Sequence, residues 1–291
     1  MDGSRKEQKA LPMLVLRKMM ELSKSEWETA TSWLLIGAIF FAMRSCEYLE
    51  TNAREEARRT KILRVRNIQF VKGGKKISHH DKKLEESDMV MITFEFQKND
   101  QRDTQIHMFK TNDPILNPVK AWARTIQRVL QYPGGREDSK VCCFWSKENG
   151  LTDIKADHVR IRLRAVVDII GEATLGFTKD EIGLHSLRSG GAMAMFLSGT
   201  STIVIRRIGR WSSEAFLEYI REQVEDFTAG VAQKMLTYEN FSHLSGGAMT
   251  EGYAPGKVNK EDGPESVPFT IQFSQMALEN EKEMVKRRLR R

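Results

Sequence analysis

The sequence predicts a mainly α protein with a small antiparallel β-sheet, organised as one helix-rich domain and a tail. Apolar residues recur at helical spacing through much of residues 13–236. Residues 89–109 instead alternate apolar and polar side chains on both sides of a polar turn. With 40% hydrophobic and 29% charged residues among 291, the composition excludes wholesale disorder and collagen-like or disulfide-dense scaffolds.

The first elements are helical. Leu, Trp, Ile and Phe are spaced for two helices within residues 13–53, with Ser23 or Ser25 as the cap between them. The apolar run from Trp33 to Met43 is too short to span a bilayer and ends directly at Arg44, so it predicts a buried helix.

The sheet is expected next. Residues 65–71 could form a strand, and Gly73-Gly74 begins a polar loop that continues to Asp88. Residues 89–96 and 104–109 then form a hairpin, with its turn at Lys98-Asn99-Asp100.

The rest of the domain returns to helical spacing, around a short apolar piece at residues 141–145. The helices are expected at 118–131, 153–171, 186–198, 201–209, 213–221 and 223–236. Residues 245–268 are rich in Gly and Pro, which predicts a linker, and a charged helix could follow from about 272. The expected organisation is an N-terminal tail (1–12), one domain (13–244) and a flexible basic C-terminal tail (245–291).

Positive charge is concentrated in one window. The whole chain carries a formal +7 with a pI near 9.2, whereas Arg54 to Lys83 holds eleven basic and three acidic residues. Such a window favours a phosphate-facing surface, and a solvated basic loop is the alternative. The candidate DNA-binding residues within it are Arg64, Arg66, Lys72, Lys75 and Lys76.

The three cysteines do not make a disulfide framework. Cys142 and Cys143 are adjacent, which suits neither a bridge nor a zinc site, and a reducing compartment is the natural interpretation. The first ten residues are charged and polar and contain no cleavable signal. We therefore expect an intracellular protein with no membrane partner, nuclear in a eukaryote and otherwise cytoplasmic.

Reactive side chains are densest between residues 185 and 221. His185 and Arg188 are three apart at an expected helix start, so both can reach one anion beside the backbone N–H groups. Gly190-Gly191 favours a close backbone approach. Trp211 brings an indole donor and Tyr219 a phenol. Each alone fits an ordinary structural role, but together they supply what phosphodiester cleavage needs.

These motifs resemble the catalytic box of tyrosine recombinases, the phage-integrase-type DNA recombinases. The matching pieces are His185-x-x-Arg188, Gly-x-Trp211 and Tyr219-Ile-Arg, and residues 209–221 are especially similar to recombinase-like proteins of eukaryotic Crypton and DIRS-type mobile elements. Upstream, Arg44 is followed three residues later by Glu47, and Lys98 lies at a hairpin turn, as in that family. The resemblance covers about residues 13–236 and implies the tyrosine recombinase catalytic-domain architecture.

The resemblance also implies roles for these residues. Arg44 and Arg188 would grip the scissile phosphate, Trp211 would donate to it, and Glu47 would orient Arg44 or His185. Arg210 would add a DNA contact.

In the chemical step that the family implies, Tyr219 would attack phosphorus and form a 3′-phosphotyrosine. Lys98 would protonate the 5′-oxygen, and His185 would help to move the tyrosine proton. No metal and no cofactor would be required, because the covalent intermediate conserves the bond energy. The sequence accordingly has no P-loop motif and no zinc spacing.

The implied function is DNA recombination or integration by strand cleavage and rejoining on double-stranded DNA, with a homodimer or homotetramer forming there. Tyr219 follows Trp211 by eight residues, where nine is usual in phage and bacterial enzymes, and the family's preceding arm-like domain is missing. A catalytically silent DNA-binding remnant of a mobile element is therefore the main alternative. A type IB topoisomerase and a basic RNA-binding protein are weaker ones.

Overall fold

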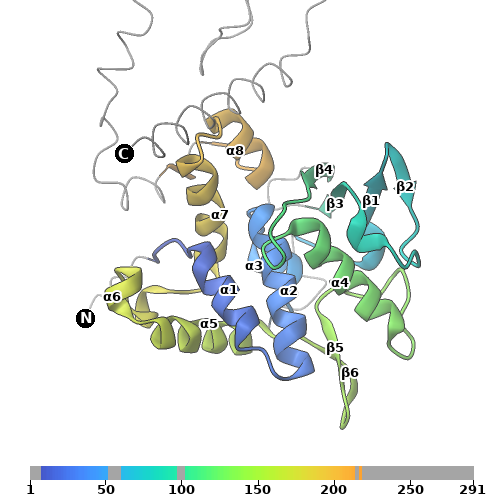
Figure 1. The fold of residues 1–291 in the computed structure, drawn as a ribbon, viewed down its shortest axis with the longest axis horizontal. Helices are drawn as coiled ribbons and strands as arrows, with labels where there is room; N and C mark the ends of the chain where they lie inside the picture. The colour runs from blue at the N-terminus through green and yellow to red at the C-terminus, as the bar shows by residue number, and fades with distance from the viewer. Residues whose placement is uncertain (1–7, 52–59, 97–101, 214–215, 218–291) are drawn as a thin grey trace, which may run out of the picture. The chain divides into compact units, whose positions relative to one another are not determined.

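The computed structural model describes residues 8–51, 60–96, 102–213 and 216–217 (Figure 1). The chain divides into two units, Met1–Glu225 and Asp226–Arg291, and every described residue belongs to the first. Most of the expected helices at 213–221 and 223–236, and the expected tail from 245, lie outside the described residues. Helices dominate the described part and antiparallel strands make up the rest, which confirms the predicted fold class.

The two N-terminal helices are confirmed as α1 (Met13–Glu21) and α2 (Glu26–Phe40). Most of the side chains of α2 are buried, because α1, α4 (Pro118–Gln131) and α7 (His185–Leu197) pack around it. This position explains why the sequence of α2 is apolar on every side.

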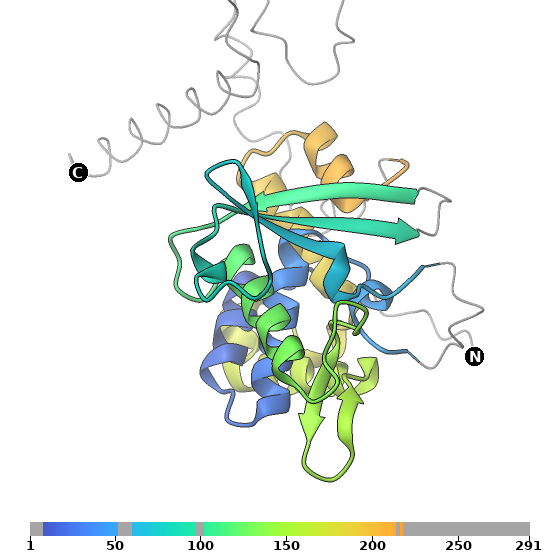
Figure 2. The same cartoon turned by 90° about the vertical axis from the view of Figure 1, so that its right-hand side faces the viewer.

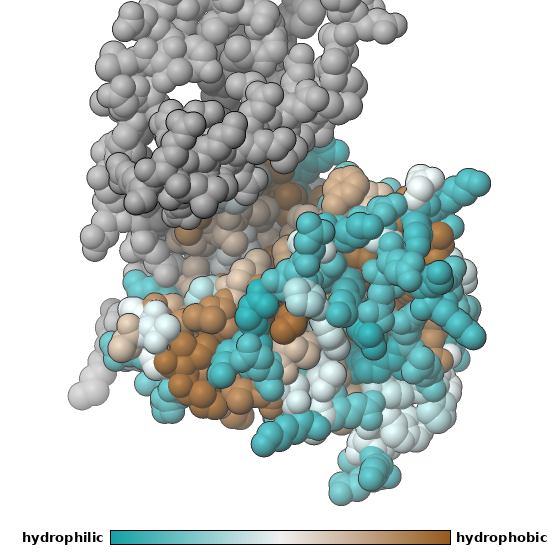
Figure 3. Space-filling model, in the orientation of Figure 1, coloured by the Kyte–Doolittle hydropathy of each residue, from teal (hydrophilic) through white to brown (hydrophobic). Residues whose placement is uncertain are grey.

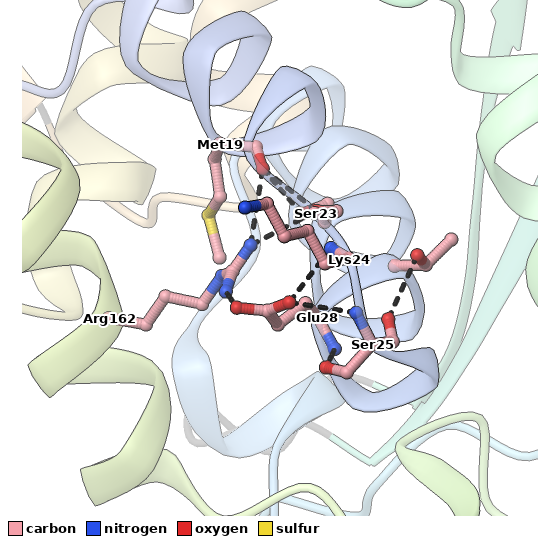
Figure 4. A network of polar contacts seen from close by, with 8 residues as sticks. Met19, Ser23, Lys24, Ser25, Glu28 and Arg162 are labelled. Atoms are coloured by element: carbon pink, nitrogen blue, oxygen red, sulfur yellow. Dashed lines mark hydrogen bonds and ion pairs between the residues drawn. The ribbon is translucent and has the colours of Figure 1, made fainter.

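A polar network fixes the turn between α1 and α2 (Figure 4). Ser25 caps α2: its Oγ accepts from the Glu28 N–H at 3.2 Å, and Oε2 of Glu28 accepts from the N–H groups of Ser25 and Lys24, each at 2.8 Å. Arg162, from α5 (Ala156–Ile170), forms an ion pair with Glu28 and donates to the Met19 carbonyl at 3.2 Å. Glu28, the acidic member of this capping box, therefore also anchors α5.

Acid should weaken this network. Hydrogen bonds from the backbone of Ser25 and Lys24, and then the Arg162 guanidinium, lower the pKa of Glu28 to about 2. Because an unfolded Glu titrates near about 4.3, the carboxylate stabilises the fold above that pH, and this contribution is lost as the pH falls towards 2.

We expect Glu28→Gln to destabilise the protein at neutral pH and to make its urea midpoint less sensitive to acid than that of the wild type. Glu148→Gln, at an exposed position in a turn, is the control. Equal acid sensitivity of Glu28→Gln and the wild type would contradict the assignment.

The main sheet has the antiparallel order β2-β1-β3-β4 (Figure 2). Its strands are β1 (Ile68–Lys72), β2 (Lys75–Ile77), β3 (Met89–Phe96) and β4 (Arg102–Phe109). The β3–β4 hairpin is confirmed, with Ile92 paired to Ile106 and Phe94 to Thr104. The expected loop after Gly73-Gly74 is partly wrong: both glycines have positive φ, so they close a tight turn and residues 75–77 pair back onto β1.

A second hairpin, β5 (Cys143–Ser146) and β6 (Gly150–Asp153), precedes α5. From the sequence, a single apolar piece at residues 141–145 and a helix starting at residue 153 were expected. In the structure, α5 starts at Ala156. The remaining helices are α3 (Ser45–Tyr48), α6 (Glu172–Leu175) and α8 (Thr202–Gly209), and single 3₁₀ turns form at Val65–Asn67, Leu84–Glu86 and Lys179–Glu181.

The residues directly before α1 pack against the rest of the domain. Ala10 and Leu11 are buried, and the Leu11 N–H donates to the Ser186 carbonyl at 2.9 Å. A Cβ added at Gly190 would lie 2.2 Å from the Leu11 carbonyl oxygen, and one at Gly191 would lie 2.4 Å from that of Ile39. The close backbone approach predicted for this glycine pair is therefore confirmed.

The face of the domain seen in Figure 3 has a hydrophilic part and an apolar part. Hydrophilic side chains gather over the sheet and α4, whereas an apolar area lies over α1 and α5. In the part of the chain that the structure describes, every helix is too short or too polar to cross a bilayer.

Candidate active site

A turn between α2 and α3 presents the first arginine. Ala42 has a φ of 42°, which is unusual for a residue with a Cβ, and the chain reverses there so that Arg44 lies at the start of α3. The Arg44 side chain retains 21% of its exposure, so its guanidinium faces solvent in part.

Glu47 holds two arginines. Its carboxylate has no exposed surface; Oε1 lies 3.1 Å from Nη1 of Arg44, and Oε2 lies 2.6 Å from Nη2 of Arg210. Oε2 also accepts from the Arg44 backbone N–H at 2.8 Å. Glu47 therefore fixes both the main chain and the side chain of Arg44, which fits the orienting role expected for it.

Arg210, a candidate DNA-binding residue, is buried in the described structure. Its side chain has no exposed surface, because the left-handed conformation of Arg210 (φ 57°) turns it inwards from the end of α8. The guanidinium carbon lies 3.6 Å from the centroid of the Phe94 ring. Burial lowers the pKa of Arg210, and the charge of Glu47 opposes this effect. The residue is a buried partner of Glu47.

Arg188 joins three segments. Its Nη1 donates to the Ala42 carbonyl at 2.5 Å, and its Nη2 donates to the Gly209 carbonyl at 2.6 Å. The guanidinium carbon lies 4.1 Å from the centroid of a Trp211 ring, and the residue is only 2% exposed. Arg188 is thus held in place beneath Trp211, and some of its N–H donors are already bonded to backbone carbonyls.

The absence of a side chain at Gly209 allows the Trp211 ring to pack against the end of α8. A Cβ added at Gly209 would fall 1.6 Å from the Trp211 ring, so only glycine lets the indole fold back over the end of α8. The ring also packs against Phe216, with centroids 5.4 Å apart.

His185 is the first residue of α7 and keeps an exposed face. Partial desolvation, and then the positive charges of Arg188 and Arg44, lower the pKa of His185. A neutral imidazole is therefore favoured at neutral pH, which is the form that can accept a proton.

The structure thus brings together five of the seven residues predicted for catalysis and its support: Arg44, Glu47, His185, Arg188 and Trp211. Lys98 and Tyr219 lie outside the described residues, the former in the interval between β3 and β4.

The basic window is partly neutralised by the fold. Arg66 forms ion pairs with Glu95 and Asp138, Lys72 lies 2.9 Å from Glu86, and Arg64 donates to a backbone carbonyl. The other two candidate DNA-binding residues, Lys75 and Lys76, are exposed on β2.

Sequence reasoning missed the pairing of Glu47 with Arg210, which are 163 residues apart. It also missed a cleft of about 450 Å³ beside Trp211, lined by Thr104, Ile203, Arg206, Arg207, Arg210 and Trp211. The adjacent arginines of α8 were the visible signal for this cleft, but β4 forms its other wall. Among the described residues, no three His, Cys, Asp or Glu side chains are placed to hold a metal ion.

No protein-family model and no curated protein matches this sequence. Among solved structures, the fold is similar to the XerH site-specific recombinase bound to difH substrate in a pre-cleavage complex, with a TM-score of 0.45 and 10% sequence identity. The similarity covers 81% of this chain and 56% of that one, so this chain spans about half the length of that recombinase.

Proposed function

We propose that this protein cleaves and rejoins strands of double-stranded DNA through a covalent bond to Tyr219. The observation that carries the proposal is the convergence of Arg44, from the α2–α3 turn, with His185 and Arg188, from α7, while Glu47 and Trp211 hold the arginines in place. Two guanidinium groups beside a neutral imidazole suit a phosphodiester that gains negative charge as it reacts.

In the proposed step, the Tyr219 oxygen attacks phosphorus and His185 accepts its proton. The bond between phosphorus and the 5′-oxygen breaks as Lys98 supplies a proton to that oxygen. The products are a 3′-phosphotyrosyl protein and a free 5′-hydroxyl, and the reverse step rejoins the strand. The charges of Arg44 and Arg188 stabilise the pentacoordinate phosphorus in between.

The proposal is tested with a nicked duplex from which the short strand end diffuses away after cleavage, so that the covalent intermediate accumulates. Incubation with the full chain, with EDTA present, should give a protein–DNA adduct that survives denaturant. Failure to form an adduct on a panel of such duplexes, by a protein that binds them, would instead support a catalytically silent DNA-binding protein.

One observation favours that second function. Arg188 is enclosed beneath Trp211, and both of its terminal nitrogens donate to backbone carbonyls. A phosphate can use Arg188 only if it reaches the remaining donors or displaces one of these bonds. If the phosphate displaces one of these bonds, Trp211 or the Ala42 turn has to shift when DNA binds, whereas a silent binding protein requires no such shift.

The role of Lys98 can be tested independently. If it protonates the 5′-oxygen, Lys98→Ala should slow cleavage by roughly 10²–10⁴-fold with little change in DNA affinity. A substrate with a 5′-bridging phosphorothiolate, whose sulfur leaves without a proton, should recover most of that loss. Lys110→Ala is the matched control, because Lys110 follows β4 and its Nζ lies 2.9 Å from Asp88. Absence of rescue would assign Lys98 a purely electrostatic role.

We further propose assembly as a homodimer or homotetramer on DNA, and an origin in a eukaryotic mobile element. The eight-residue spacing from Trp211 to Tyr219 supports this origin. Light scattering of the protein with and without a duplex tests the assembly.

A further inference from the structure

Arg206 and Arg207 stand apart from most other arginines of the fold. Arg17, Arg66, Arg162 and Arg210 each form an ion pair with a carboxylate. Within the part of the chain that the structure describes, neither Arg206 nor Arg207 has a carboxylate partner. Arg206 donates from Nη2 to the Ser212 carbonyl at 3.3 Å, and Arg207 is exposed. Two positive charges on one turn of α8 therefore form no ion pair with a described carboxylate.

Both arginines line the cleft between α8 and β4. Thr104 forms the wall on the β4 side, and Ile203 and Trp211 add apolar surface. A small inorganic anion would gain nothing from contact with these apolar side chains. A sugar-phosphate backbone presents both a charged phosphate and the apolar face of a deoxyribose, so it matches the mixed lining.

Two residues that line the cleft also contact residues of the candidate active site. Trp211 lines the cleft and stacks on Arg188, and Arg210 lines the cleft and pairs with Glu47. Trp211 therefore separates the cleft from Arg188 by the thickness of one aromatic ring.

We propose that Arg206 and Arg207 bind a second phosphate of the DNA strand, adjacent to the one that reacts, and so guide the strand between α8 and β4. This inference rests on the proposed function for the identity of the ligand. The arginines would act as positioning residues, since they hold the strand and do not touch the reacting atoms.

The test is the salt dependence of binding to a DNA duplex of about 20 base pairs, measured by fluorescence anisotropy. Arg206→Gln/Arg207→Gln should lower the slope of log affinity against log salt by about two units, because each neutralised phosphate contributes close to one. Arg206→Lys/Arg207→Lys retains the charges and should retain most of the slope. Lys24→Gln/Lys147→Gln is the control: Lys24 lies between α1 and α2, and Lys147 lies between β5 and β6. Both connections are far from α8 (Figure 1), so this variant should leave the slope unchanged.

Both arginines also lie in the last turn of α8, where a positive charge interacts favourably with the helix dipole and so stabilises the helix. Thermal unfolding of each variant therefore accompanies the binding measurement. If the double Gln variant does not fold, Arg207→Gln alone should lower the slope by about one unit.

The outcomes separate the inference from the proposed function. A wild-type slope in the folded Gln variant, or an equal fall in the Lys24→Gln/Lys147→Gln control, overturns the inference while leaving adduct formation untouched. A lowered slope in a protein that forms no adduct supports the inference and overturns the strand-cleavage proposal. Displacement of the duplex by inorganic phosphate at constant ionic strength overturns the assignment to a sugar-phosphate backbone.

Discussion

Replacing Tyr219 with Phe is expected to abolish the covalent protein–DNA adduct while leaving DNA affinity unchanged. The substitution removes only the oxygen that would bond to phosphorus and retains the aromatic ring. Denaturing electrophoresis of the protein with a labelled nicked duplex measures the adduct, and mass spectrometry of the trapped peptide identifies the modified residue.

Tyr132→Phe is the matched control. Burial and a hydrogen bond to Glu26 contribute to raising the pKa of Tyr132 to about 12, so its phenol is a poor nucleophile at neutral pH. This variant should form as much adduct as the wild type. An adduct from Tyr219→Phe, or a modified peptide that contains another tyrosine, would contradict the proposed nucleophile.

Glu47→Ala should be strongly destabilising. It leaves the buried Arg210 guanidinium without its counter-charge, and breaking a buried pair in this way costs about 3–5 kcal/mol. The free energy of unfolding in urea measures the loss. Because Glu47 also holds Arg44, any folded fraction should cleave DNA slowly.

A double variant separates charge from packing. Glu47→Gln/Arg210→Met removes both buried charges while retaining similar volume, so it should be more stable than Glu47→Ala. It should still cleave slowly, since Arg44 loses its ionic partner. Glu21→Ala, which breaks the exposed pair with Lys18, should change stability little. If Glu47→Ala is as stable as Glu21→Ala, Arg210 must have another counter-charge.

Much of the fold could be predicted because its signals are local. The Ser25 cap, the hairpin of residues 89–109 and the helix after Pro118 each depend on neighbouring residues. The short strands β2 and β6 were missed, since three or four residues carry too little alternation to be recognised.

The residues of the candidate site were proposed from the sequence, together with the contact between Glu47 and Arg44. The motifs around Arg44 and His185 were recognised through their resemblance to a family. That Arg210 turns inwards to Glu47 follows from a left-handed backbone conformation and a contact between distant segments, and neither leaves a local pattern. The positions of Lys98 and Tyr219 remain predictions.

The contacts of Arg188 and Glu47 have an evolutionary consequence. Arg188 ties α7 to the α2–α3 turn and to the end of α8, and Glu47 ties α3 to Arg210. If a descendant had lost the proposed cleavage reaction, both residues would still stabilise its fold, so selection would retain them. In the proposed mechanism Lys98 and Tyr219 act only in the reaction, so neutral substitutions would accumulate at these two positions first. Among related chains, substitution at these two positions beside an unchanged Arg188 and Glu47 would therefore mark the lineages that bind DNA without breaking it.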